Sequence, residues 1–163
     1  MPDVDLLELL SADHQNLMSD ESDSFVATVT QHLTVERTLL YPAIEKYESG
    51  GKAIVEDLRG SDHVLELRLA ALEAAPTPGN HGAVDAAIRA HVARREVLYP
   101  ELRRTIPASE LEELAGEVPL TVGGSPTRPH PHLPEHGALG EVAEQLEVIA
   151  DRLHDKLHHD EGR

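Results

Sequence analysis

The chain has no cysteine among its 163 residues. That absence excludes a disulfide framework, a cysteine-ligated zinc finger and a thiol nucleophile. Tryptophan is also absent and there is a single phenylalanine, yet the chain has 11 histidines. The imidazoles therefore serve some purpose other than filling an aromatic core.

Positive charge is scarce as well. Lysine and arginine together number 14 against 30 aspartates and glutamates, so the formal net charge is −16. A protein that binds nucleic acid needs a basic face to meet the phosphates, so we expect no nucleic-acid partner. The acidity itself is most simply a solvated surface.

Long apolar runs are missing too. No uncharged stretch approaches the roughly 20 residues that a membrane-spanning helix needs. The first ten residues contain two aspartates, one glutamate and no lysine or arginine, whereas a secretory signal begins with basic residues. The sequence therefore predicts a cytoplasmic protein without a membrane partner.

Hydrophobic periodicity predicts an all-α fold with four long helices, at about 4–19, 22–48, 53–75 and 82–105. The breaks between them carry turn-forming residues such as Ser49-Gly50-Gly51. Short connections of this kind imply an up-down-up-down four-helix bundle, which we expect to occupy residues 1–107.

The remainder is expected to hold a linker and one more helix. Ser109 and Glu112 are spaced as a capping box, which predicts a short helical turn ending near Ala115. Five prolines and three glycines follow within residues 116–134, so residues 108–135 are interpreted as that turn and an irregular linker. Residues 136–163 are predicted to form an amphipathic C-terminal helix packed on the bundle.

Three of the four long helices carry polar residues in the middle of an otherwise apolar stripe. These residues are His14 in the first helix, His32 and Glu36 in the second, and His91 and Arg95 in the fourth. Because His32 and Glu36 are four positions apart, their side chains lie on one face of the helix. Each of these stripes is expected to face the bundle core.

The third helix allows two stripes. One contains His63 between Gly60 and Leu67, with Glu66 three residues after the histidine. The other runs through Val55, Leu58, Leu65, Leu69 and Leu72 and leaves His63 on its flank.

A shared metal site explains these polar residues best. A single core histidine is ordinarily satisfied by a protein partner, and His32 with Glu36 could be an ordinary helical pair. Four buried histidines and a glutamate cost several kcal/mol, of order 1–3 for each group, unless something satisfies them. Imidazole and carboxylate are ligands suited to iron.

The order of these motifs resembles the hemerythrin-like (HHE cation-binding) family over about residues 4–105, in particular an actinobacterial subgroup with His-x-x-x-Arg in the fourth helix. The motifs are Asp13-His14, His32-x-x-x-Glu36 before Leu40-Tyr41-Pro42, Asp62-His63, and His91 before Leu98-Tyr99-Pro100. The resemblance implies a four-helix bundle with two iron ions, joined by an oxo or hydroxo bridge. It implies His14, His32, Glu36, His63 and His91 as metal ligands.

The same resemblance implies a function. The expected protein is a non-haem di-iron protein that binds or reduces dioxygen, peroxide or nitric oxide, in sensing, storage or defence against oxidative and nitrosative stress. If it is an enzyme, it is a catalase-like or peroxidase-like oxidoreductase. The alternative is a metal-free helical interaction module with a salt-bridged polar core and an unknown protein partner. A zinc hydrolase is less favoured.

The fourth helix departs from many members of the family. Arg95 stands where they have a bridging glutamate, and Glu96 follows directly as a candidate ligand. Glu66, Tyr41 and Tyr99 are weaker candidates to complete the metal shell. Arg95 either replaces a metal charge or stands beside the metal and stabilises a bound oxidant. Further histidines in the tail are expected to be exposed: His130, His132, His136, His154, His158 and His159.

Overall fold

The computed structural model describes residues 4–131 together with residues 148, 151 and 155. Every regular element within these residues is a helix, which confirms the predicted all-α class. The helices are α1 (Leu6–Ser19), α2 (Phe25–Val35), the π-helix η1 (Glu36–Leu40), α3 (Tyr41–Tyr47), α4 (Gly51–Ala74), α5 (Pro78–Glu96), α6 (Tyr99–Thr105) and α7 (Ala108–Gly123). The expected helix over residues 136–163 falls almost entirely outside the described residues.

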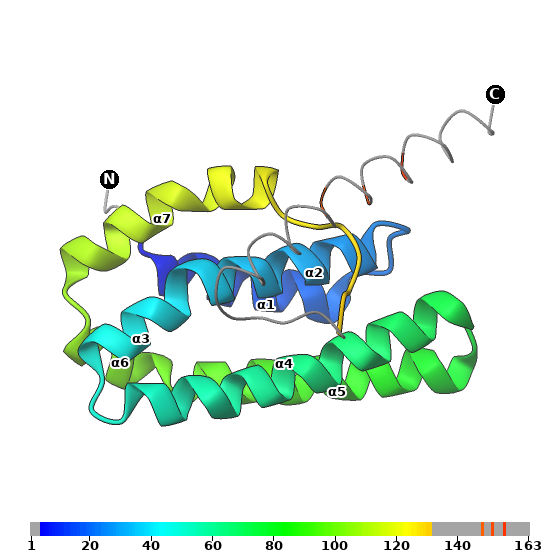
Figure 1. Cartoon of the computed structure of the whole chain (residues 1–163), viewed down its shortest axis with the longest axis horizontal. Coiled ribbons are helices and arrows are strands. Elements are labelled where there is room, and N and C mark those ends of the chain that lie inside the picture. The colour runs from blue at the N-terminus through cyan, green and yellow to red at the C-terminus, as the bar shows by residue number, and fades with distance from the viewer. Residues whose placement is uncertain (1–3, 132–147, 149–150, 152–154, 156–163) are drawn as a thin grey trace.

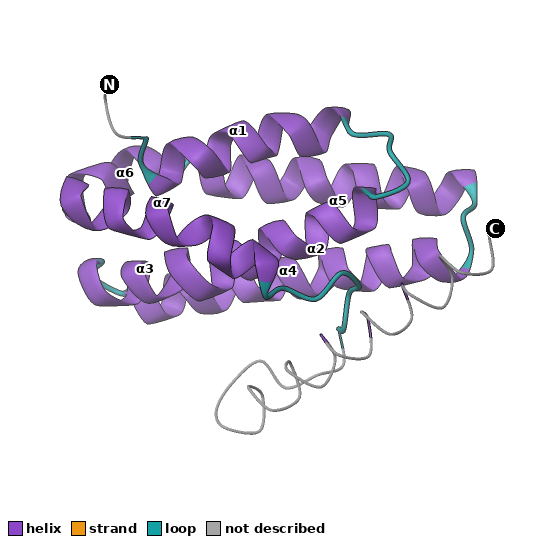
Figure 2. Ribbon diagram, turned by 90° about the horizontal axis from the view of Figure 1, so that it is seen from above, coloured by secondary structure: helices purple, strands orange, loops and turns teal. Residues whose placement is uncertain are grey.

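Four rods form the bundle (Figures 1 and 2). The first rod is α1, the second is α2 continued through η1 into α3, the third is α4, and the fourth is α5 followed by α6. Neighbours in the ring are α1 and α2, α2 and α4, α4 and α5, and α5 and α1. Short turns join successive rods, as the sequence predicts.

Local signals in the sequence account for the ends of the rods. The Asp5 carboxylate accepts a hydrogen bond from the backbone N–H of Glu8 at 2.8 Å, which caps α1. Thr77 caps α5 in the same way through the N–H of Asn80. The turn into α4 requires glycine at Gly50, whose φ of 73° lies in the left-handed region.

The second rod changes its helical geometry at η1. Pro42 has no backbone N–H, so it cannot donate to the carbonyl four residues earlier. Instead the N–H of Tyr41 donates to the carbonyl of Glu36, five residues back. This wider turn brings the Tyr41 side chain onto the face of Glu36, where an α-helix would place Leu40.

Two apolar clusters fill the core, and the polar residues lie between them. One cluster joins the start of α1 to η1, α3 and α6, with Leu6, Leu40 and Ile44 at its centre. The other joins the end of α1 to α2, α4 and α5, with Leu33 and Leu69 at its centre. The polar stretch of each rod therefore falls at the middle of the bundle.

The buried face of α4 is the second of the two stripes that the sequence allowed. Val55, Leu58, Leu65, Leu69 and Leu72 are all buried. On the other stripe, Gly60, His63 and Leu67 are exposed, so the placement of His63 in a core seam is wrong. The choice depends on which face meets α2 and α5, a contact that α4 alone does not specify.

Helix α7 is longer than the predicted turn. It continues past Ala115 to Gly123, although Pro119 lies inside it. Leu111 and Ala115 are buried, and Val118 and Val122 pack against the first apolar cluster. This packing against α1, α2 and η1 outweighs the backbone hydrogen bond that Pro119 removes.

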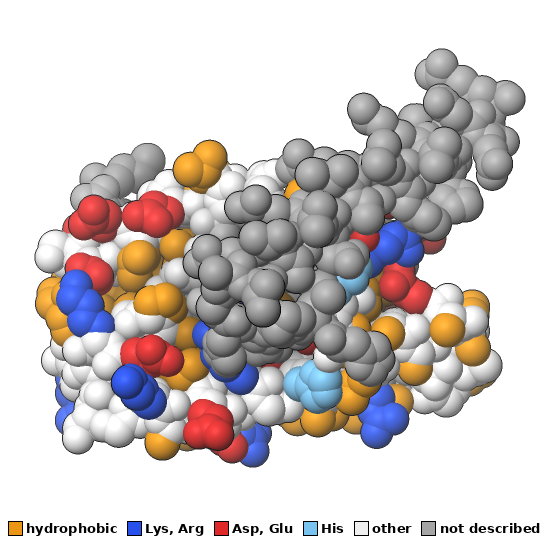
Figure 3. Space-filling view, in the orientation of Figure 1, with side chains coloured by type: hydrophobic (Ala, Val, Ile, Leu, Met, Phe, Trp, Pro, Cys, Tyr) orange, Lys and Arg blue, Asp and Glu red, His pale blue; other side chains and the backbone are white. Residues whose placement is uncertain are grey.

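On the face shown in Figure 3, acidic and basic side chains of the described residues are interspersed with hydrophobic ones. Across the described part of the chain, none of the helices combines the length and the apolar character needed to cross a membrane.

Candidate metal centre

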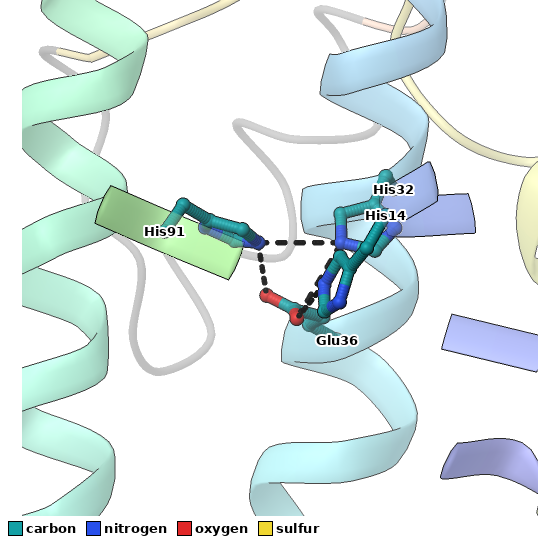
Figure 4. Close-up of side chains that lie close together, drawn as sticks. All are labelled: His14, His32, Glu36 and His91. Atoms are coloured by element: carbon teal, nitrogen blue, oxygen red, sulfur yellow. Dashed lines mark hydrogen bonds and ion pairs between the residues drawn. The ribbon is translucent and has the colours of Figure 1, made fainter. Parts of the chain in front are cut away.

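Four buried side chains meet at the middle of the bundle (Figure 4). They are His14 from α1, His32 from α2, Glu36 from η1 and His91 from α5. One nitrogen or oxygen of each lies within 4.8 Å of those of the other three. None of the four residues is more than 3% exposed, so the group is shielded from bulk water.

The three imidazoles present the same nitrogen to the centre. Nε2 of His14 lies 3.7 Å and Nε2 of His32 lies 3.5 Å from Oε1 of Glu36. Nε2 of His91 lies 3.4 Å from Oε2 of the same carboxylate. The rings therefore converge on Glu36 from three different helices.

The opposite nitrogen of each ring faces a carboxylate. Nδ1 of His14 lies 2.8 Å from Glu96, while Nδ1 of His32 and of His91 lie 3.5 Å from Asp13 and Asp62. Carboxylates in this position are typical of metal-binding histidines. They favour a proton on Nδ1, so each ring in its neutral form directs the Nε2 lone pair into the centre.

Two of the converging atoms have no hydrogen-bond partner within the described residues. They are Nε2 of His14 and Oε1 of Glu36, both fully buried. A buried polar atom left unsatisfied costs about 1–3 kcal/mol. A cation bound between the two atoms would remove both penalties.

The spacing of the donor atoms fits one metal ion. Ligand atoms arranged tetrahedrally about 2.1 Å from an ion lie about 3.4 Å from each other. Oε1 of Glu36 lies 3.7 Å from Nε2 of His14 and 3.5 Å from Nε2 of His32. Nε2 of His91 lies 3.4 Å from Oε2 of Glu36 and 3.3 Å from Nε2 of His32, and the ligand atoms of all four residues lie within 4.8 Å of one another. The four side chains could therefore hold one metal ion between them.

Arg95 lies beside this group and is completely buried. Its Nε donates to Oε2 of Glu36 at 3.2 Å, and its Nη2 donates to Asp62 and to the Tyr41 hydroxyl. Its Nη1 donates to the Ser61 hydroxyl at 2.9 Å. The Tyr41 hydroxyl in turn donates to Oδ2 of Asp62 at 2.6 Å. One guanidinium thus ties together two buried carboxylates and a phenol.

These charges shift the pKa values at the centre. Burial raises the pKa of Glu36, but the positive charges of His91, Arg95 and His32 outweigh burial and hold that pKa well below its usual range. Burial lowers the pKa of His32, but the carboxylates of Glu36 and Asp13 outweigh burial and raise it to about 9. Without another cation at neutral pH, the centre therefore carries a protonated His32 beside an ionised Glu36.

The two tyrosines of the Leu-Tyr-Pro motifs remain neutral phenols. Burial and then the nearby Glu36 carboxylate raise the pKa of both Tyr41 and Tyr99. The Tyr99 ring stacks on His14 with centroids 6.0 Å apart, and its buried hydroxyl makes no hydrogen bond to the described residues. Tyr99 therefore offers a hydrogen-bond donor next to the centre.

A groove lies between α4 and α5, beside the centre. It has a volume of about 640 Å³ and is lined partly by small residues, among them Gly60, Ser61, Ala87 and Ala90. His91 also lines it, although that residue is only 2% exposed.

The other candidate ligands lie apart from the four that converge. His63 is exposed, and its neighbour Asp62 occupies the inward position on α4. Glu66 is buried but accepts a hydrogen bond from Nη1 of Arg37 at 2.8 Å. Glu96 contacts the outer nitrogen of His14 and also accepts from the Ser11 hydroxyl.

Among the tail histidines, His130 is partly buried and lies 3.3 Å from the Asp151 carboxylate, so its expected full exposure is wrong. The remaining tail histidines, His132, His136, His154, His158 and His159, fall outside the described residues.

The sequence alone assigns no role to Asp13 and Asp62, whose carboxylates face the outer nitrogens of His32 and His91. Each precedes a histidine in an Asp-His pair, and that repeated pair was the available signal. In α1 the histidine of the pair faces the core, whereas in α4 the aspartate does. The pair alone does not say which of its two residues is buried.

The helical bundle with its buried His/Glu cluster is compatible with a hemerythrin-like fold. No match was found when the chain was compared with models of known protein families, with characterised proteins and with solved structures.

Proposed function

We propose that this protein is a non-haem iron protein that binds or reduces a small oxidant: dioxygen, peroxide or nitric oxide. The observation that carries the proposal is the convergence of three Nε2 atoms on the Glu36 carboxylate, with buried donor atoms left unsatisfied. The resemblance of its motifs to hemerythrin-like proteins supports the same function.

The choice of iron rests on the resemblance of the motifs to those of hemerythrin-like proteins. Imidazole nitrogen with one carboxylate oxygen suits iron, and the chain has no cysteine to favour a thiolate site. Bound iron would supply a coordination position for the oxidant and the capacity to exchange electrons with it. His14, His32, His91 and Glu36 would hold the ion, and a position that they leave open would take the oxidant.

The chain's own residues would select and hold the oxidant. The groove between α4 and α5 would admit a molecule of a few atoms to His91, and the apolar clusters on either side of the centre limit access by bulk water. The Tyr99 hydroxyl, which makes no hydrogen bond to the described residues, would donate one to the oxidant. Arg95 holds Glu36 in place from the side opposite its unsatisfied oxygen.

Iron content and the near-ultraviolet and visible spectrum of aerobically purified protein test the proposal. His91→Ala should lose the iron because it removes one converging nitrogen, while His63→Ala should keep it because His63 is exposed on α4. Both variants should stay helical by circular dichroism. Protein that contains no iron after growth in iron-rich medium would contradict the proposal.

A second candidate is the metal-free helical module with a salt-bridged polar core. It is favoured by the network in which Arg95 already compensates Glu36 and Asp62. On this alternative, neither added iron nor a chelator changes the melting temperature. On the iron proposal, iron raises the melting temperature because it binds the folded chain alone.

A further inference from the structure

We infer that the centre holds a single metal ion, because the Arg95 guanidinium occupies the place of a second one. This inference rests on the proposed function and departs from the two-iron centre that the resemblance implies. It follows from which donor atoms are free and which are already engaged with a cation.

The converging donors form one set. The Nε2 atoms of His14, His32 and His91 meet the Glu36 carboxylate, and one ligand atom from each of the four residues lies within 4.8 Å of the others, close enough for one ion. No second group of three or more histidine, aspartate or glutamate ligand atoms with comparable spacing occurs among the described residues. A second ion would therefore have to take carboxylates from the groups around the first.

Those carboxylates are engaged with cations of the chain itself. Oε2 of Glu36 accepts from Nε of Arg95 at 3.2 Å, and Asp62 accepts from Nη2 of the same guanidinium. The second oxygen of Asp62 accepts from the Tyr41 hydroxyl at 2.6 Å and lies 3.5 Å from Nε of Arg37. Glu66, one turn further along α4, is paired with Arg37 as well.

Arg95 also excludes a second ion by its charge. A guanidinium cannot release its proton in a protein, so it remains a fixed positive charge in the core. It lies between Glu36 and Asp62, the two buried carboxylates nearest the centre, and repels a metal ion placed between them. The Ser61 hydroxyl and the Leu58 carbonyl hold the guanidinium in this position from α4.

The remaining carboxylate near the centre, that of Glu96, lies on the side of the His14 ring away from the centre. Glu96 contacts Nδ1 of His14, whereas the free Nε2 of that ring points toward Glu36. A bridging carboxylate would have to lie on the side of the His14 ring to which Nε2 points, where the metal would bind. Glu96 therefore orients His14 and does not join two ions.

The test is the number and the magnetism of the iron ions bound by the wild-type protein. The metal-free protein is loaded anaerobically with excess Fe(II), desalted, oxidised in air and examined by iron assay and electron paramagnetic resonance. The expected result is about one iron per chain, and a half-integer-spin resonance signal whose intensity accounts for all of the bound iron. Two irons per chain that are magnetically coupled, and so give no resonance signal when oxidised, would overturn this inference and leave the proposed function standing. Absence of iron would overturn the proposed function itself.

Two variants test the role of Arg95. Arg95→Glu replaces the guanidinium by a carboxylate and should raise the iron content to two ions per chain, as long as circular dichroism shows that the variant is folded. Arg94→Glu changes the charge equally at the adjacent position, where Arg94 is exposed and pairs with Asp57, and should keep the wild-type count. A folded Arg95→Glu protein that still binds one ion would show that Arg95 is not what excludes the second. The wild-type measurement decides the stoichiometry even if Arg95→Glu does not fold.

Discussion

Replacing Arg95 by methionine removes the guanidinium that donates to both Glu36 and Asp62. Methionine has a similar length and no charge, so the change deletes the cation and fills most of its space. In the metal-free protein, the two carboxylates are completely buried and cannot recover water as a partner. We expect a large loss of stability.

The magnitude follows from the contacts. Removing one partner of a buried ion pair typically costs about 3–5 kcal/mol, because the other charge is left buried without compensation. Arg95 engages two such charges, but Glu36 also faces the protonated His32, and Asp62 keeps the Tyr41 hydroxyl and Arg37. The expected loss therefore stays at about 3–5 kcal/mol, a large part of the roughly 5–15 kcal/mol that stabilises a domain.

Urea unfolding followed by circular dichroism measures this loss. The experiment uses chelator-treated protein at neutral pH, with Arg94→Met as the matched control. Arg94 is half exposed on the same helix and pairs with the exposed Asp57, so its replacement should cost less than about 1 kcal/mol. If Arg95→Met costs no more than Arg94→Met, the buried network does not contribute as argued.

Three further predictions concern the neighbours of this network. Tyr41→Phe deletes a hydroxyl that accepts a hydrogen bond from a guanidinium and donates one to a carboxylate. It should lower the unfolding free energy by about 1–3 kcal/mol in the same urea assay. The control Tyr47→Phe, at a partly exposed tyrosine, should lower it by well under about 1 kcal/mol. Glu96→Gln should keep the iron count and weaken iron affinity about 10–100-fold, measured by competition with a chelator, because it perturbs only the outer nitrogen of His14. A Glu96→Gln protein without iron would instead make Glu96 a ligand. Folding raises the pKa of His32 to about 9, so this residue should add about 3 kcal/mol to the unfolding free energy of the metal-free protein. That contribution should be fully present below pH 6.5 and should be lost as the pH rises through about 9. The urea midpoint should fall over that range in the wild type, and a His32→Gln protein should lack this component of the decrease.

The sequence predicts the bundle and most of the gathered side chains because both depend on local periodicity. His14, His32, Glu36 and His91 fall in apolar stripes of single helices, and a stripe identifies its own buried face. His63 was misplaced because α4 has two stripes, and the packing of α2 and α5 decides between them. Such a choice is a property of the tertiary structure.

The hydrogen-bond partners of Arg95 could not be predicted for a different reason. Tyr41 comes five residues after Glu36, a spacing that places two side chains on different faces of an α-helix. The π-helix η1 brings them to one face, and the sequence marks that change only by Pro42. The extent of α7 differs from the prediction because the five prolines and three glycines of residues 116–134 indicate an irregular segment, whereas tertiary packing carries the helix past Pro119 to Gly123.

The wide turn in the second rod is equivalent to one extra residue in an α-helix. Deleting one residue such as Thr38 would allow an ordinary α-helix in which the tyrosine follows Glu36 by four residues and keeps its face. If an α-helix formed without that deletion, everything after it would turn by about 100° and Tyr41 would leave Arg95 and Asp62. Related chains without the wide turn should therefore have one residue fewer between Glu36 and Tyr41. Alignments that assume an uninterrupted helix here would displace the tyrosine by one position.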